Sequence, residues 1–128
     1  MAKKDIPPEV RRFILTSIPT VPHLEALMLL RATAPAPWSA PELARRLYVA
    51  PAIARDVLAG LHQAGMLCRD DLSSAYAYQS QAHDAGGVID NLAEQYSSNL
   101  VEITLLIHSR LDRKAQQFAD AFNFRKDA

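Results

Sequence analysis

Residues 38–80 constrain the fold more than any other part of the chain, because start and stop signals divide them into short, closely spaced elements. Ser39 and Glu42 form a Ser-x-x-Glu capping box with a proline in the first turn, so that free backbone N–H groups find acceptors. Leu43 and Leu47 follow at helical spacing on one face. The pattern predicts a short helix that begins directly after Ser39.

The residues after Leu47 predict a turn and a second helix. Residues 48–50 interrupt the helical pattern, and Pro51 restarts it at a position where a missing N–H costs nothing. Gly65 ends this helix, since glycine readily adopts the left-handed conformation that follows helix ends. The residues expected on its buried side are Ile53, Val57, Leu58 and Leu61.

A hairpin is expected next. Residues 66–69 and 75–79 are short strand-like runs, and residues 70–74 have the polar composition of a tight reversal. Helix, short turn, helix and hairpin is the plan of a winged helix-turn-helix, a fold that commonly places its second helix in a DNA groove.

The same region is similar to a known class of proteins. The segments that carry the similarity are Leu43-Ala44-Arg45-Arg46-Leu47, Ile53, Val57-Leu58, Leu61 and Ala64-Gly65-Met66-Leu67. They resemble bacterial winged-helix regulators of the MarR and PadR kind, and Tyr76 and Tyr78 resemble the aromatic wing strand of those regulators. The resemblance implies transcription regulation through double-stranded DNA and a dimer formed by C-terminal helices.

The fold class expected for the whole chain is mainly α with a small β-hairpin wing. Apolar spacing and prolines predict two helices within residues 1–37, at 8–18 and 22–32. We expect one domain over residues 1–128, with N-terminal helices at 1–37, the helix-turn-helix and wing at 38–80, and a long C-terminal dimerisation helix and tail at 85–128.

The C-terminal helix carries an apolar seam at alternating steps of three and four residues. Its members, the expected dimer interface, are Ile89, Leu92, Tyr96, Asn99, Ile103 and Leu106. A polar Asn99 inside such a seam can set its register. Between Leu100 and Ile107 the helix is apolar on almost every side, so it must be covered by the N-terminal helices or by a second subunit. We expect a homodimer; a helix packed within a monomer, with Asn99 solvated, is the alternative.

The tail carries three of the four phenylalanines, at positions 118, 122 and 124. With Asp112 as N-cap, Leu111, Phe118 and Phe122 fall on one helical face. We expect a terminal helix docked on its own subunit or on the partner, with the basic tail residues outward, either near DNA phosphates or as part of a lid on the core.

Charge and cysteine content narrow the function classes. The 14 basic and 14 acidic side chains give a formal net charge of zero, so the bulk charge does not itself favour nucleic acid. Residues 81–109 hold four acids and no Lys or Arg, whereas residues 110–128 hold five basic and three acidic groups.

A single cysteine suits a cytoplasmic protein, and no apolar run is long enough for a membrane span. Cys68 is interpreted as a small buried hydrophobe, with an oxidant sensor as the alternative.

Catalytic, metal and cofactor motifs are missing. The four histidines (His23, His62, His83 and His108) are scattered without an HExxH spacing, and the chain has no phosphate loop, serine elbow or dinucleotide fingerprint. We therefore expect neither an enzyme nor a bound metal or cofactor.

The side chains best placed to touch DNA come from the helix-turn-helix and the wing. Arg55, on the second helix, is expected at a base edge, where arginine can bind guanine bidentately. The remaining candidates, expected mainly at phosphates, are Arg45, Arg46, His62 and Arg69. The alternative is a winged helix that assembles with another protein, because Ala52, Ala54, Asp56 and Ala59 offer DNA few donors.

Overall fold

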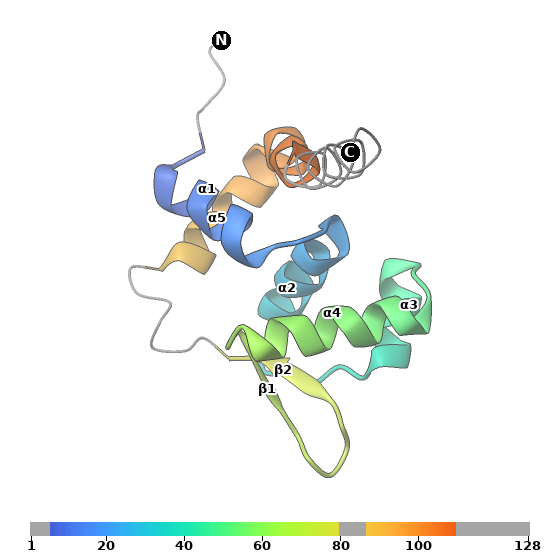
Figure 1. Ribbon diagram of the computed structural model, residues 1–128. Coiled ribbons are helices and arrows are strands. Elements are labelled where there is room, and N and C mark those ends of the chain that lie inside the picture. The colour runs from blue at the N-terminus through green and yellow to red at the C-terminus, as the bar shows by residue number, and fades with distance from the viewer. Residues whose placement is uncertain (1–5, 80–86, 110–128) are drawn as a thin grey trace, which may run out of the picture. The chain divides into compact units, whose positions relative to one another are not determined.

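The computed structural model describes residues 6–79 and 87–109 of the chain. The described part is mainly helical and contains a two-stranded antiparallel sheet (Figure 1). Internal contacts divide the chain into two compact units. One unit is Val21–Ile89, and the other joins the residues up to Thr20 with those from Asp90 onward.

The Val21–Ile89 unit consists of three helices followed by a hairpin. Its elements are α2 (Val21–Thr33), α3 (Ala40–Leu47), α4 (Pro51–Gln63), β1 (Leu67–Arg69) and β2 (Tyr76–Tyr78). Helix α4 packs against α2, α3 and β1, while α2 also contacts α3 and β2. The large side chains buried in this unit include Leu24, Leu27, Leu30, Leu43, Leu58, Leu61 and Met66. Helix α4 is therefore covered on one side and exposed on the other.

Helix α3 begins at the predicted capping box. The Glu42 backbone N–H donates to Ser39 Oγ at 3.3 Å, and the Ser39 N–H donates to Glu42 Oε1 at 3.2 Å. The helix ends at Tyr48, which has φ 58° and ψ 45° and is almost fully exposed. A tyrosine in this left-handed conformation is strained, because its Cβ crowds the backbone. The turn between α3 and α4 is therefore tight and presents an aromatic ring to solvent.

Helix α4 begins at Pro51, and Gly65 follows it with φ 86°, both as predicted. Its buried face is Ala54, Val57, Leu58 and Leu61. The prediction was wrong at Ile53, which is 45 % exposed, and at Ala54, which is fully buried. Both residues fit the apolar spacing, so the spacing alone does not decide which of them is buried.

The hairpin contains a contact that the sequence did not indicate. Strands β1 and β2 pair antiparallel, with Arg69 opposite Tyr76. The backbone of Trp38 adds an antiparallel bridge to Tyr76, with N···O distances of 2.7 and 2.8 Å. The Trp38 indole N–H also donates to Thr33 Oγ1 at 3.0 Å. The segment between α2 and α3 is thus tied to β2 as well as to the end of α2.

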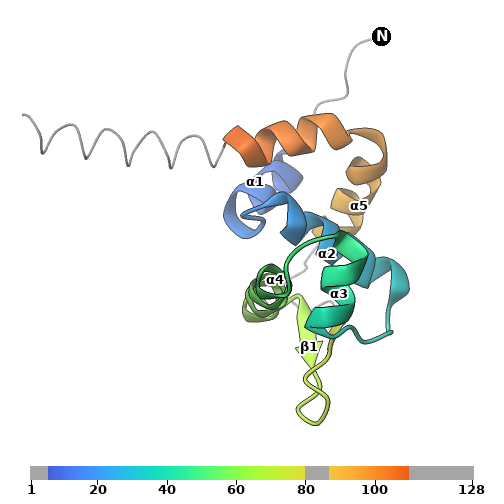
Figure 2. The ribbon, with the colours of Figure 1, turned by 90° about the vertical axis from the view of Figure 1, so that its right-hand side faces the viewer.

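The second unit holds α1 (Pro8–Ser17), most of α5 (Val88–Ser98) and a further helix, Leu100–Ser109. Figure 2 shows the chain turning sharply between α5 and the Leu100–Ser109 helix. The buried apolar side chains of this unit are Ile6, Val10, Ile14, Ile18, Leu92, Ile103 and Ile107.

The prediction of one continuous C-terminal helix was wrong, since α5 ends at Ser98 and a new helix starts at Leu100. The hydroxyls of Ser97 and Ser98 both donate to the Glu94 carbonyl, at 2.9 and 3.1 Å. Such back-bonding competes with the helical ladder and bends helices. The Asn99 carbonyl then accepts the Ile103 N–H at 3.0 Å and opens the next helix. The apolar seam is therefore divided between two helices.

Candidate functional site

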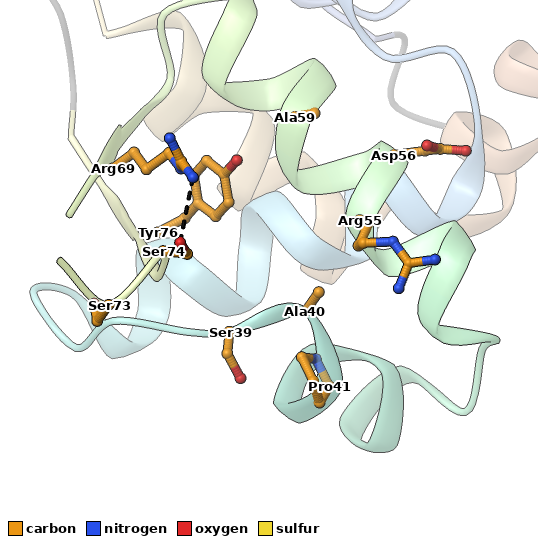
Figure 3. Close-up of a pocket in the computed structure, with 10 residues that line it drawn as sticks. All are labelled: Ser39, Ala40, Pro41, Arg55, Asp56, Ala59, Arg69, Ser73, Ser74 and Tyr76. Carbon is orange, nitrogen blue, oxygen red and sulfur yellow. Dashed lines mark hydrogen bonds between the residues drawn. The ribbon is translucent and has the colours of Figure 1, made fainter. Parts of the chain in front are cut away.

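The exposed face of α4, the start of α3 and the hairpin border an open groove of about 560 Å³. Its charged lining residues are Arg55 and Asp56 from α4 and Arg69 from β1 (Figure 3). Its hydroxyl groups come from Ser39, Ser73 and Ser74, and Tyr76 forms part of its wall. We call this hollow the α4–hairpin groove.

Arg69 is held in place at the end of β1 that leads into the hairpin turn. Its Nη2 donates to Ser74 Oγ at 3.3 Å, and its guanidinium lies 6.0 Å from the centre of the Tyr76 ring. The His62 ring meets Tyr76 edge-on, with 5.5 Å between ring centres. A cation above an aromatic ring is attracted by the ring electrons, so Tyr76 orients Arg69 at the groove.

Arg55 is less restrained than Arg69. Its side chain is exposed, and the guanidinium has no hydrogen-bond or ion-pair partner within residues 6–79 and 87–109. Figure 3 shows Arg55 and Arg69 at opposite sides of the groove, with the Arg55 side chain extending toward α3. The groove thus offers an unpaired cation from a helix and an oriented cation from a strand, among the described residues.

The hairpin turn carries negative charge. Asp70 Oδ2 accepts from the Ser73 hydroxyl at 2.7 Å, and Asp70 Oδ1 accepts from the Leu72 N–H at 3.2 Å. These hydrogen bonds hold the pKa of Asp70 below its ordinary value, the Ser73 bond having the larger effect. Leu72, at the turn, is 97 % exposed. An anionic ligand would therefore be attracted to Arg69 and repelled by the neighbouring turn.

The first turn of α3 already contains a negatively charged side chain, that of Glu42. Hydrogen bonds from the Ser39 side chain, and then from its backbone N–H, lower the pKa of Glu42. Glu42 thus remains ionised over the first turn of the helix, where a negative charge is favourable. This carboxylate occupies the position that an external anion would otherwise take.

The structure brings together some of the residues predicted to contact DNA. Arg55 and Arg69 share the α4–hairpin groove, and His62 joins it indirectly through Tyr76. Arg45 and Arg46 are exposed on the last turn of α3 but do not line the groove. The sequence interpretation missed Tyr76 as the support of Arg69. Pairing the two strands across the predicted turn would have placed them opposite one another.

The predicted dimer residues are not gathered on one open face. Ile89, Leu92 and Ile103 are buried within the chain, while Tyr96, Asn99 and Leu106 are half-buried. A homodimer remains a prediction. The predictions for residues 110–128 and for His83 lie outside the described residues.

Cys68 corrects another prediction. Its side chain is exposed, and its Sγ lies 3.6 Å from the Ala77 carbonyl oxygen, so it is not a buried hydrophobe.

The described ranges contain no cluster of three or more His, Cys, Asp or Glu side chains able to hold a metal ion.

Among the described helices, no single one is long and apolar enough to cross a membrane; α1 and α2 reach such a length only as a broken pair.

Comparison of the chain with protein-family models, with curated proteins and with solved structures finds no match in any of the three.

Proposed function

We propose that the Val21–Ile89 unit is a winged helix-turn-helix that binds double-stranded DNA in a dimeric, cytoplasmic transcription regulator. In this proposal α3 and α4 are the helix-turn-helix, and the β1–β2 hairpin is the wing. The backbone bridge from Trp38 to Tyr76 supports it, because the bridge ties the wing to the segment that leads into α3. The observation that carries the proposal is the α4–hairpin groove, with guanidinium groups from both the helix and the hairpin.

Each arginine has its own role in the proposed complex. Helix α4 enters the major groove, where Arg55 donates two hydrogen bonds to a guanine and contributes about 1–3 kcal/mol of discrimination. Arg69, oriented by Tyr76, contacts a phosphate beside the wing. Arg45 and Arg46 reach phosphates from α3, and His62 is a weaker candidate from the end of α4. Three arginines on phosphates predict a salt slope of about −2.7 per subunit, hence modest affinity.

The test is a fluorescence anisotropy titration at low salt against genomic fragments, including the promoter of the protein's own gene. We expect Arg55→Ala to lose the preference between fragments while weak binding remains. Arg69→Ala should weaken binding to every fragment and reduce the salt slope by about 0.9 per subunit. Arg12→Ala is the matched control, since Arg12 is exposed on α1, outside this unit. Equal binding to all fragments that Arg55→Ala leaves unchanged would contradict sequence-specific regulation.

A second function, assembly with another protein, is favoured by a different observation. The outward centre of α4 presents Ala52, Asp56 and Ala59, and the hairpin turn presents Asp71 and Leu72, all of them exposed. These side chains offer DNA phosphates no cation, whereas small and apolar groups allow close protein contact. Pulldown from native lysate separates the two functions by the absorbance ratio of the eluate at 260 and 280 nm. A stoichiometric protein partner without nucleic acid would favour assembly.

A further inference from the structure

The turn between α3 and α4 and the start of α4 expose apolar side chains. Tyr48 is 94 % exposed and Ile53 is 45 % exposed, and Pro51 and Ala52 between them are exposed as well. Single exposed apolar residues are normal, whereas neighbouring ones favour a surface that a ligand covers. We call Tyr48, Ala52 and Ile53 the turn surface.

Tyr48 contributes little to the core of the protein. Its backbone has φ 58° and ψ 45°, a left-handed conformation in which glycine avoids the crowding of a Cβ atom. Because its ring is almost fully exposed, packing within the described residues does not offset this strain. A strained backbone that holds an exposed ring favours a use of that ring outside the fold.

The charges around the turn surface indicate what covers it. Residues 43–55 contain three arginines and no acidic residue. Arg45 and Arg46 are exposed on the last turn of α3, and Arg55 follows the turn surface on α4, with its side chain extending toward α3 (Figure 3). An apolar surface with cations on both sides fits a polyanion that also presents apolar groups. The major groove of DNA is such a ligand, because thymine places a 5-methyl group there between the phosphates of the two strands.

We propose that the turn surface recognises thymine, with Ala52 and Ile53 in contact with 5-methyl groups in the major groove. This inference rests on the proposed DNA-binding function and adds a second base to the guanine that Arg55 recognises. A methyl group needs no hydrogen-bond donor, so the lack of polar side chains at the start of α4 does not prevent base recognition.

Helical spacing places the thymine relative to the guanine. Ala52 and Arg55 are three residues apart, so they lie on the same face of α4, about 4.5 Å apart along its axis. Base pairs stack at about 3.4 Å, and the thymine therefore lies within about two base pairs of the guanine. Tyr48, in the turn, meets the sugar–phosphate backbone, to which its hydroxyl donates a hydrogen bond.

Replacement of thymine by uracil tests the methyl contact, because it removes the 5-methyl group and leaves every base-pairing group in place. The probe is a short synthetic duplex with the sequence that the protein prefers among the genomic fragments, made once with thymidine and once with deoxyuridine. Binding is measured by fluorescence anisotropy. We expect the deoxyuridine duplex to bind about fourfold more weakly for each methyl group contacted, the factor that corresponds to about 0.8 kcal/mol per buried CH₂.

Two variants assign the effect to the turn surface. Ile53→Ala should bind the two duplexes more nearly equally, because the methyl group loses its partner. Leu105→Ala is the matched control, since Leu105 is also aliphatic and is 55 % exposed, but lies on the Leu100–Ser109 helix; its preference for thymidine should not change. Equal binding of the two duplexes by the wild-type protein would overturn the inference. An undiminished preference in Ile53→Ala would also overturn it, since the methyl groups would then act through DNA shape.

Tyr48→Gly separates the fold from the contact. The variant should raise the melting temperature, because glycine adopts the left-handed conformation without crowding, and should weaken binding of both duplexes by the same factor. An unchanged affinity would overturn the backbone contact assigned to Tyr48.

Failure of the inference is distinguishable from failure of the proposed function. If Arg55→Ala abolishes the preference between fragments while the thymidine and deoxyuridine duplexes bind equally, the inference is wrong and the DNA-binding function stands. A protein that prefers no fragment contradicts both. A protein partner in the pulldown that is lost in Ile53→Ala would show that the turn surface binds protein, and would overturn the inference.

Discussion

The segments Ala40–Tyr78 and Val88–Ser109 were both interpreted from sequence, with different success. In the first segment the helices start and stop where local signals predict, at Ser39, Pro51 and Gly65. In the second, apolar periodicity predicts one helix, and the structure has two. Capping residues satisfy particular backbone groups and therefore identify boundaries, whereas periodicity identifies only an apolar face.

Asn99 shows why periodicity was misleading. Its position fits the three–four spacing of the seam, yet Asn and Ser are also residues that hydrogen-bond to nearby backbone and end helices. Ser97 and Ser98 bond back to Glu94, and the Asn99 side chain donates to Gln95 Oε1 at 2.7 Å. Three consecutive polar residues of this kind were a signal for a break, and the heptad interpretation counted only one of them.

Much of the fold could be predicted, because helices α1 to α4 and both strands have their determinants within a few residues. The Trp38–Tyr76 bridge could not, since it joins residues far apart in sequence. Whether Ile53 or Ala54 lies on the buried face also depends on tertiary packing, since both residues fit the apolar spacing. For the candidate site, the sequence indicated Arg55 and Arg69 individually, while their shared groove follows from tertiary packing.

The largest expected effect tests the buried face of α4. Leu58→Ala should lower the free energy of unfolding by about 2–5 kcal/mol, because it leaves a cavity at a fully buried position. Ile53→Ala should cost much less, since the Ile53 side chain is 45 % exposed. Urea denaturation followed by circular dichroism measures both. An equal loss in the two variants would mean that the sequence prediction of a buried Ile53 was correct.

A smaller effect compares the two kinds of helix start. Ser39→Ala removes the capping box and should lower the free energy of unfolding by about 0.5–2 kcal/mol, measured by urea denaturation.

Asn99→Ala should lose the bond to Gln95 and favour a continuous helix, seen in backbone carbon chemical shifts of residues 98–101. Thr104→Ala is the control, because it removes a polar side chain that bonds to the Leu100 carbonyl within the Leu100–Ser109 helix, away from the break. Unchanged shifts in Asn99→Ala would show that tertiary packing, not Asn99, imposes the break.

The smallest effect concerns the hairpin turn. Hydrogen bonds from the Ser73 hydroxyl and the Leu72 N–H depress the pKa of Asp70, so its ionised form contributes stability above the unfolded pKa. That contribution is lost as the pH falls through the folded pKa. Ser73→Ala should raise the Asp70 pKa toward its ordinary value, measured by titrating the side-chain carboxyl carbon by NMR. Glu42 is the internal control, because its depressed pKa depends on Ser39 and should not move. If the Asp70 pKa stays depressed in Ser73→Ala, the Ser73 hydroxyl is not the group that stabilises the carboxylate, and the geometry of the turn in solution differs from that described.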